Sequence, residues 1–424
     1  MPTNLQTKKI CVIGGGASGF FTSILLGEFL EEWIGRSQVQ IQIFEASKEP
    51  LQKVKISGGG RCNVTHNLFS IPHLVEKYPR GNQELKQAFS RFQPKDTIEW
   101  FSQKGISLKT EPDGRMFPIT NSSQTIIDCF QEQRKKYGIP LHLSKNIRKI
   151  AYDSESKKFQ IVADEESLEF DFLIFASGSN RNSFELIKSL GHSIVSPVPS
   201  LFTLNIPDPT LHELSGQSVN FASIHILPKG KKQVGPILVT HWGLSGPAVL
   251  RLSAYEAREF FEKNYQLEVE VNWLGEKKAE EFLSDLEKWK STVPAKSISS
   301  VSPEQISSRL WNYFLVQANV EPSKKMGEIS KLEIRNLSQI VCKFRCKVDG
   351  KSVYKEEFVT AGGVQRKEVQ FGFMESKLIS NLYFVGEVLD IDGITGGFNF
   401  QNAWTTSYIC AKHISQGFFE KGIA

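Results

Sequence analysis

Two hydrophobic runs near the start of the chain flank a helical pattern. Residues 10–13 are all apolar, and apolar side chains recur at helical spacing from Phe20 to Ile34. A second run, in which apolar residues alternate with glutamines, extends from Val39 to Glu45. This order predicts a β-α-β unit, in which a helix joins two parallel strands.

Two further apolar runs of this kind lie far apart in the sequence. Asp171 to Gly178 ends in small residues, as expected where the backbone passes close to a bound cofactor. Leu382 to Asp390 is followed by glycines and by a helical pattern that starts at Phe398. Strand, glycine loop and closing helix predict one α/β domain whose two halves are separated in the sequence.

The stretch between these halves has a different pattern. Two segments alternate like half-buried strands, and two have helical spacing. They are 219–227 and 266–273 for the strands, and 276–289 and 303–316 for the helices. We therefore predict a discontinuous domain formed by 1–190 and 356–424, and an inserted domain at 191–355 with a helical part at about 250–335.

The first strand ends in the glycine pattern G-x-G-x-x-G, formed by Gly14, Gly16 and Gly19. In a dinucleotide-binding turn, the first glycine makes the turn, the second lets the backbone approach a pyrophosphate, and the third lets the helix pack on the strand. Glu45 ends the second strand, where a carboxylate can accept hydrogen bonds from the adenosine ribose. Strand, turn, helix and carboxylate together predict a dinucleotide site.

Composition and charge narrow the class of protein. The 424 residues are 40% hydrophobic and 23% charged, as in a globular protein of two or three domains. The 51 basic and 46 acidic residues give a net charge of +5 without a long basic block, so nucleic acid binding is not expected. No run of 18 apolar residues occurs, so no membrane span is predicted.

Six scattered cysteines favour a reducing cytoplasm. Cys342 and Cys346 lie in an alternating stretch, 340–348, where a strand would place both thiols on one face. We expect buried core thiols there rather than a metal or redox centre, and we predict no metal site.

A second glycine cluster, "KVKISGGGRCN" from Lys53 to Asn63, has more glycines than a simple loop requires. Backbone placed against a flat ring system would explain it. With five other stretches, it resembles the BaiN-like family of NAD(P)/FAD-dependent oxidoreductases, also described as aminoacetone-oxidase-family flavoproteins. The other stretches are "VIGGGASG", "EPDGRMFPITNSSQ", "THWGLSGPAVL", "VTAGGV" and "GEVLDIDGITGGFNFQNAW".

The resemblance implies a discontinuous Rossmann-type FAD-binding domain with an inserted domain that has a β-barrel-like part and a helical part. It also implies which residues contact FAD. These are Gly14, Gly16, Ala17, Ser18 and Gly19 around the pyrophosphate, Glu45 at the adenosine ribose, Lys53, Ser57, Gly58, Gly60 and Asn63 on the flavin side, and Asp390, Gly397, Phe398, Asn399 and Gln401 at the ribityl chain and ring.

Two further glycines belong to the same expected surface. Gly59 lies within the cluster that we expect to lie on the flavin, and Gly396 precedes the helix that starts at Phe398. The positive N-terminal end of that helix would stabilise the negative charge of reduced flavin. By contrast, we expect Gly81, in "YPRGNQ", to be an ordinary loop glycine outside any motif.

The expected activity is that of an FAD-dependent oxidoreductase acting on a small organic substrate, with NAD(P)H as a transient hydride donor. Because bound flavin carries the hydride, few side chains need to act; Cys62 and His241 are the candidates, and Arg61 and Arg115 either bind an anionic group or face solvent. Two alternatives stay open: a flavin-dependent protein that modifies nucleic acid such as tRNA, and a non-catalytic FAD-binding redox sensor. The sequence predicts neither the substrate nor the oligomeric state.

Overall fold

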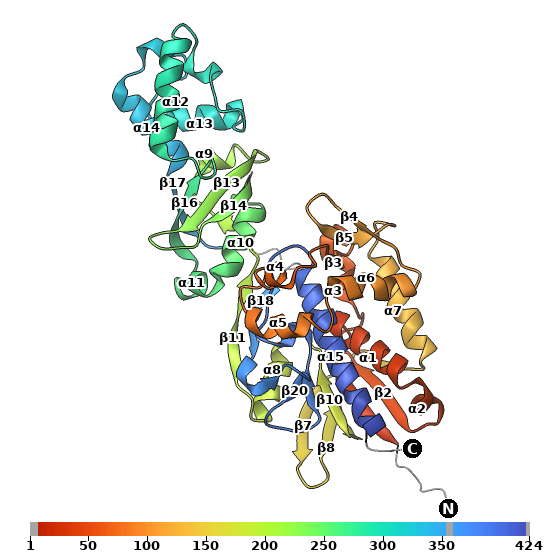
Figure 1. Ribbon diagram of the computed structural model, residues 1–424. Helices are drawn as coiled ribbons and strands as arrows, with labels where there is room; N and C mark the ends of the chain where they lie inside the picture. Colours follow the sequence, from red (N-terminus) through yellow and green to blue (C-terminus); the bar gives the residue numbers. More distant parts are fainter. Residues whose placement is uncertain (1–6, 353–358, 421–424) are drawn as a thin grey trace, which may run out of the picture. The chain divides into compact units, whose positions relative to one another are not determined.

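The computed structural model describes residues 7–352 and 359–420, and the chain divides into two compact units (Figure 1). Unit 1 consists of Met1–Pro197 and Val359–Ala424, and unit 2 consists of Val198–Phe358. Among the described residues, none of the helices combines the length and the apolar character needed to cross a bilayer.

Unit 1 is built on a seven-stranded sheet in the order β19-β20-β21-β10-β1-β2-β6. The strands are β1 (Lys8–Ile13), β2 (Val39–Phe44), β6 (Leu141–His142), β10 (Phe172–Phe175), β19 (Val369–Gln370), β20 (Glu375–Ser376) and β21 (Leu382–Phe384). The five strands from β21 to β6 are parallel, whereas β19 and β20 are antiparallel to their neighbours. Because both faces of the parallel strands are covered, Ile10, Cys11 and Val12 are fully buried.

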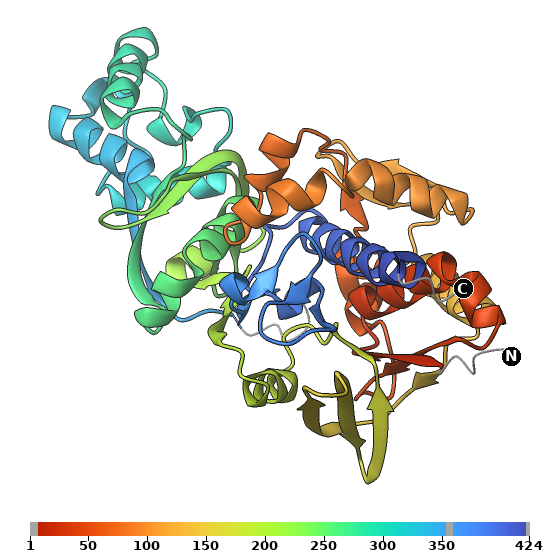
Figure 2. The ribbon, with the colours of Figure 1, turned by 60° about the horizontal axis from the view of Figure 1, so that its bottom comes forward.

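Helix α1 (Ala17–Phe29) follows β1 and runs beside the C-terminal helix α15 (Phe398–Glu420) (Figures 1 and 2). It is buried over most of its length, because α15 and the strands β1 and β2 are among the elements that pack against it. An antiparallel meander packs against β1 and β10. It consists of β7 (Ile147–Asp153), β8 (Lys158–Ala163) and β9 (Glu166–Phe170).

The remaining elements of unit 1 surround this centre. A small antiparallel sheet has the order β3-β5-β4, and β11 pairs with β18. These strands are β3 (Thr65–His66), β4 (Leu108–Thr110), β5 (Arg115–Pro118), β11 (Ile194–Ser200) and β18 (Val359–Val364). The other helices are α2 (Glu31–Gly35), α3 (Gln52–Gly60), α4 (Ile71–Val75), α5 (Asn82–Phe89), α6 (Pro94–Gln103), α7 (Gln124–Lys136) and α8 (Arg181–Ser189), with 3₁₀ turns η3 (Arg366–Glu368) and η4 (Gly386–Val388).

Unit 2 combines a barrel-like sheet with a helical part. Six strands have the order β12-β15-β14-β13-β16-β17, and Leu204 in β12 forms a bridge with Lys351, just after β17, so the first and last strands meet. They are β12 (Leu204–Asn205), β13 (Ser218–Ile226), β14 (Gln233–Thr240), β15 (Gly243–Ser245), β16 (Gln266–Asn272) and β17 (Phe344–Asp349). The helices are α9 (Pro209–His212), α10 (Pro247–Tyr255), α11 (Ala257–Glu262), α12 (Ala279–Thr292), α13 (Ser308–Gln317) and α14 (Lys331–Cys342), with 3₁₀ turns η1 (Ile298–Ser300) and η2 (Met326–Glu328).

Two predictions about single elements were wrong. The helix expected at 20–34 is two helices, because the chain leaves helical geometry at Leu30 between α1 and α2. The strand expected at 340–348 is the end of α14 followed by β17, so Cys342 ends a helix while Cys346 lies in a strand; both are buried free thiols. Within the range 250–335, which we predicted to contain the helical part, β16 occupies the position of the strand expected at 266–273.

Candidate cofactor site

The three motif glycines have different surroundings in the turn between β1 and α1. Gly14 has φ +112°, and a Cβ there would lie 2.5 Å from the Ala176 carbonyl oxygen in the neighbouring strand connection. A Cβ on Gly19 would overlap the Gly14 carbonyl oxygen. A Cβ on Gly16, by contrast, would meet nothing within 4 Å. Gly14 and Gly19 therefore allow close packing, whereas Gly16 borders open space.

The N-terminus of α1 presents unused backbone donors to this space. Gly16 is the N-cap residue, no side chain caps the helix, and its first turn contains no acidic residue. Among the described residues, the amides of Ala17, Ser18 and Gly19 have no hydrogen-bond partner. Free N–H groups at the positive end of a helix dipole are suited to hold an anionic phosphate.

Glu45 follows β2 and reaches back to the glycine turn. Its Oε2 accepts a hydrogen bond from the Gly15 N–H at 2.6 Å, and its Oε1 accepts from the N–H of Ser47 at 2.8 Å and from the hydroxyl of Ser47 at 2.5 Å. An ionised carboxylate has about four lone-pair positions, of which these bonds use three, so Oε2 can still accept one hydrogen bond from a ligand. Glu45 therefore also fixes the turn, a role that the sequence did not reveal.

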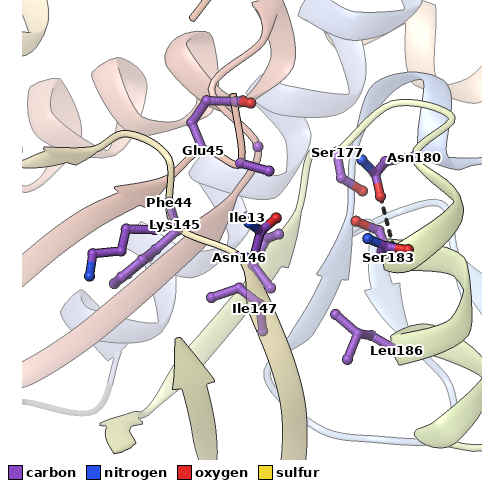
Figure 3. Close-up of a pocket in the computed structure, with 13 residues that line it drawn as sticks. Ile13, Phe44, Glu45, Lys145, Asn146, Ile147, Ser177, Asn180, Ser183 and Leu186 are labelled. Atoms are coloured by element: carbon purple, nitrogen blue, oxygen red, sulfur yellow. Dashed lines mark hydrogen bonds between the residues drawn. The ribbon is translucent and has the colours of Figure 1, made fainter. Parts of the chain in front are cut away.

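A pocket of about 70 Å³ lies beside Glu45 (Figure 3). Its walls come from the ends of β1 and β2, from the start of β7, from the β10–α8 connection and from α8 itself. They include Ile13, Phe44, Lys145, Asn146, Ser177, Asn180 and Leu186. The Ser177 hydroxyl is buried without a partner among the described residues, so a polar donor is left over at the wall of this pocket. In this pocket, an adenosine group would contact both apolar side chains and hydrogen-bonding groups.

The second glycine cluster is the irregular end of α3 rather than a free loop. Helical geometry stops at Ser57, with ψ 145°, and Gly58, Gly59 and Gly60 have φ +59°, +68° and +81°. A Cβ on Gly58 would lie 2.8 Å from the Phe117 ring, whereas one on Gly59 or Gly60 would meet nothing within 4 Å. The last two glycines therefore border open space, as Gly16 does.

The segment that follows this cluster is attached to the start of α15 residue by residue. The Asn63 amide, oriented to satisfy its neighbours, accepts from the Gly397 N–H at 2.9 Å. The Thr65 hydroxyl donates to Gln401 Oε1 at 2.6 Å. The His66 ring stacks on the Phe398 ring, with centroids 4.8 Å apart. Residues 63–66 therefore fix the position of this helix terminus.

The side chains at the start of α15 are occupied within the chain. Asn399 makes two hydrogen bonds with the backbone of Gly393, at 2.8 and 2.9 Å. Gln401 is fully buried, and Phe398 is 2% exposed. This placement favours a role in holding the helix rather than direct side-chain contact with a ligand for these three residues, which the sequence analysis had assigned to the ribityl chain and ring.

The backbone at the start of α15, however, is unoccupied. Among the described residues, the amides of Phe398, Asn399 and Phe400 have no hydrogen-bond partner, and the first turn has no acidic residue. Gly396 and Gly397 precede the helix with φ +128° and +88°. Unit 1 thus has a second uncapped helix terminus preceded by glycine.

Lys53 forms an ion pair that the sequence analysis missed. Its Nζ lies 2.5 Å from Glu387 Oε2, and Glu387 Oε1 accepts from the Thr360 N–H at 3.3 Å. A Cβ on Gly178 would lie 3.4 Å from the same carboxylate. Glu387 therefore lies where α3, β18, η4 and the β10–α8 connection meet. The only feature of the sequence that could have indicated Glu387 is its position within the motif "GEVLD".

The two catalytic candidates lie in different units. Cys62 in unit 1 is buried with φ +60°, and burial raises the pKa of its thiol to about 12, partly offset by a hydrogen bond with Ser57. Such a thiol is a poor nucleophile. His241 is exposed in the turn between β14 and β15 of unit 2.

The arginines near the glycine cluster have acidic partners. Arg61 lies 2.7 Å from Glu111 and over the Phe117 ring, and Arg115 lies 2.7 Å from Asp113. Within the described ranges, no group of three or more His, Cys, Asp or Glu side chains is arranged to hold a metal ion.

His66 is a further polar residue at this site that sequence reasoning missed. Its Nε2 lies 3.1 Å from the Asp113 carbonyl oxygen, which fixes Nε2 as the protonated nitrogen, and its Nδ1 is buried without a partner among the described residues. Burial lowers the pKa of the imidazole, and the positive charges of Lys77 and Arg115 lower it further. The hydrogen bond to Asp113 and the negative charge of Asp113 act in the opposite direction. His66 is therefore neutral at physiological pH.

Comparisons with known proteins identify the family. Residues 8–413 match the family described as HI0933-like protein Rossmann domain. The chain is 28% identical to a ribosomal RNA dihydrouridine synthase from Haemophilus influenzae, over 97% of this chain and 99% of that protein. It is 24% identical to a 3-dehydro-bile acid delta(4,6)-reductase from Clostridium scindens, over 95% and 98% of the two chains.

Among solved structures, the fold is similar to that of a 3-ketosteroid delta1-dehydrogenase from Sterolibacterium denitrificans. The TM-score is 0.51 at 10% identity, over 97% of this chain and 100% of that chain. The family match spans nearly the whole sequence, and the BaiN-like resemblance agrees with it. The chain therefore belongs to the HI0933-like family, and it is an FAD-dependent oxidoreductase with a Rossmann-type FAD-binding fold.

Proposed function

We propose that unit 1 holds FAD between its two uncapped helix termini and uses it to reduce a carbon–carbon double bond conjugated to a carbonyl group. The observation that carries the proposal is the set of free backbone amides at the starts of α1 and α15, each preceded by glycine. Two separate helix termini suit a ligand that needs an anionic group held at one end and developing negative charge stabilised at the other.

Different residues of unit 1 would bind different parts of FAD. The amides of Ala17, Ser18 and Gly19 would hold the pyrophosphate, and Glu45 with its neighbouring pocket would hold the adenosine. The open space beside Gly59 and Gly60 would receive the flavin ring. Lys53 and Glu387 would contact the flavin or its ribityl chain, since their ion pair lies among the same elements.

When bound, FAD supplies the hydride acceptor and donor, which no side chain can replace. The chain orients the ring, keeps water from it and stabilises the negative charge of the reduced form with the positive end of α15. NAD(P)H is the proposed hydride source. Because the sequence has G-x-G-x-x-G only at the β1–α1 turn, the nicotinamide would visit transiently.

The proposed substrate class rests on chemistry shared by two relatives. Dihydrouridine differs from uridine by two hydrogens across a ring double bond next to a carbonyl, and a delta(4,6)-reductase acting on a 3-dehydro substrate also reduces such a bond. Hydride adds to the far carbon of the conjugated bond, and a proton adds to the carbon beside the carbonyl. We propose a small conjugated ketone as the primary substrate.

A uridine in RNA is the second candidate. One observation favours it: the relative named for ribosomal RNA is 28% identical over nearly the whole chain, more than the bile acid reductase at 24%. The near balance of charge gives this candidate no additional support, because proteins that bind nucleic acid usually carry a basic surface.

An anaerobic assay tests the proposal and separates the candidates. Purified protein loaded with FAD is reduced with NADH or NADPH, and reoxidation is then followed by flavin absorbance after addition of a small conjugated ketone or of uridine-containing ribosomal RNA. Reoxidation by the ketone supports the primary proposal, and reoxidation by RNA alone supports the second. A flavin that neither substrate reoxidises contradicts both and favours a redox sensor.

A further inference from the structure

The loop that leads into α15 is held by a segment that is distant in the sequence. Residues 77–81 run beside residues 391–394, and the Ile394 N–H donates to the Lys77 carbonyl at 2.9 Å. Next to this contact, the Tyr78 hydroxyl donates to the carbonyl of the first residue of α15 at 2.7 Å. The segment therefore fixes both the loop and the helix terminus.

At the centre of this contact, Arg80 and Asp392 form a buried ion pair. Nε and one terminal nitrogen of the guanidinium each donate to a different carboxylate oxygen, so the pair is bidentate. The side chains are 11% and 0% exposed. Removing one partner of such a pair changes the net charge of this buried contact by one unit.

A second carboxylate of the loop also lies opposite an arginine. Asp390 is 5% exposed, and one of its oxygens lies 3.7 Å from Arg366 Nε. Arg366 in turn lies 3.4 Å from Glu84 in α5. The motif "LDID" therefore places two carboxylates just before the uncapped start of α15, and each has a guanidinium partner.

Neutralising these charges matters if reduced flavin lies at the start of α15. An unpaired carboxylate in a poorly hydrated loop would oppose the negative charge of the reduced ring, since buried charges are weakly screened. A paired carboxylate holds the loop without this effect. The requirement is therefore for a carboxylate and a guanidinium together.

We propose that Arg80 and Asp392 are a positioning pair for the flavin, which fixes the loop before α15 and balances the charge beside the ring. The proposal rests on the proposed function, because it takes the flavin to lie at this helix terminus. It goes beyond that function by assigning a role to two side chains that need not touch the cofactor.

Reduction potentials of bound FAD test the pair, because a merely structural role predicts no defined sign. Arg80→Met removes a positive charge and should lower the potential, whereas Asp392→Asn removes a negative charge and should raise it. We expect about a tenfold change in the relative affinity for reduced and oxidised flavin, or about 30 mV for a two-electron couple. The double variant should return close to the wild-type value.

Shifts of the same sign in both single variants, or none, would overturn the proposal. If Arg80→Met does not fold, Asp392→Asn alone tests the proposal, because the amide has the same shape as the carboxylate and should be tolerated. A higher reduction potential in Asp392→Asn then supports the proposed role of the pair, and any other result overturns it. Arg91→Met is the matched control, since Arg91 is exposed and bonds only a backbone carbonyl, that of Gly372, among the described residues. Wild-type protein that retains no FAD would instead contradict the proposed function.

Discussion

Glu45 accepts a hydrogen bond from the backbone N–H of Gly15 at 2.6 Å, so the carboxylate that follows β2 holds the glycine turn after β1. Glu45→Ala should therefore weaken FAD binding in two ways, by loss of a ribose acceptor and by loosening of the turn. A hydrogen bond to a charged group contributes about 1.5–3 kcal/mol, or roughly ten- to a hundredfold in affinity. FAD titration followed by flavin fluorescence measures the change.

Glu45→Gln separates the two contributions, because an amide oxygen can still accept from Gly15 but carries no charge. We expect its affinity to lie between those of wild type and Glu45→Ala. Glu49→Ala is a suitable control, since Glu49 forms an exposed ion pair with Lys55 nearby. If all three variants bound FAD with the same affinity as the wild type, Glu45 would have no role in FAD binding.

Gly60→Ala should yield protein that folds but does not retain FAD, because the added methyl group would enter the space proposed for the flavin. Gly105→Ala is the matched control: Gly105 also has positive φ, +78°, and open space around its Cβ. Both substitutions should cost about 1–2 kcal/mol of backbone strain. Thermal unfolding and flavin content after gel filtration check the pair.

Equal flavin content in these two variants would show that the open space at Gly60 is not used. Gly81, which the sequence suggested as an ordinary loop glycine, is unsuitable as the control. A Cβ there would lie 2.5 Å from Ile391, in the loop before α15. Its substitution would disturb the proposed site itself.

Cys62 should be inert in the folded protein. Its raised pKa of about 12 leaves a thiolate fraction of roughly one in ten thousand at pH 8, and the thiol is fully buried. We expect slow alkylation by iodoacetamide under native conditions and complete alkylation after denaturation, measured by mass spectrometry. Rapid alkylation of Cys62 in the folded protein would contradict this prediction and would make Cys62 a candidate redox residue again.

The stability of the protein should fall in mild acid, in part because of His66. Burial lowers the pKa of His66, so below about pH 6.5 the unfolded chain binds a proton that the folded chain does not. The free energy of unfolding therefore decreases as the pH falls through 6.5 towards the lower pKa of the folded state. His66→Gln should flatten this dependence, measured by urea unfolding between pH 7.5 and 5.5.

His192 and His225 have pKa values lowered by burial as well, so the slope will not vanish in that variant. His241→Gln is the control, because His241 is exposed in unit 2. An unchanged slope in His66→Gln would mean that His66 has the same proton affinity in the folded and unfolded chain.

The parts of the fold that could be predicted are those with local sequence signals. The strand at β1, the glycine turn and the carboxylate at Glu45 follow one another within 45 residues, and each has a recognisable period or residue type. The strand expected across Cys342 failed because alternation over a few residues cannot distinguish the last turn of a helix from the start of a strand.

The rest of the site could not be predicted because it depends on contacts between distant segments. Lys53 and Glu387 are 334 residues apart, and Arg80 and Asp392 are 312 residues apart. The sequence around a charged residue does not indicate which distant residue will form an ion pair with it. For the same reason, the complete burial of Gln401 and its hydrogen bond with Thr65 could not be predicted.

Helix α15 is the last of the described elements in sequence order, yet its start is fixed by residues 63–66 and it packs along α1. During translation, β1, α1 and residues 63–66 leave the ribosome long before their partner helix exists. At about 5–20 residues per second, unit 2 alone takes on the order of 10–30 s to synthesise. The nascent chain must therefore keep the face of α1 covered or protected during this interval. On this basis, the proposed FAD site is complete only once α15 has been synthesised, and a chain that stops before Phe398 would accumulate as a target for chaperones and proteases.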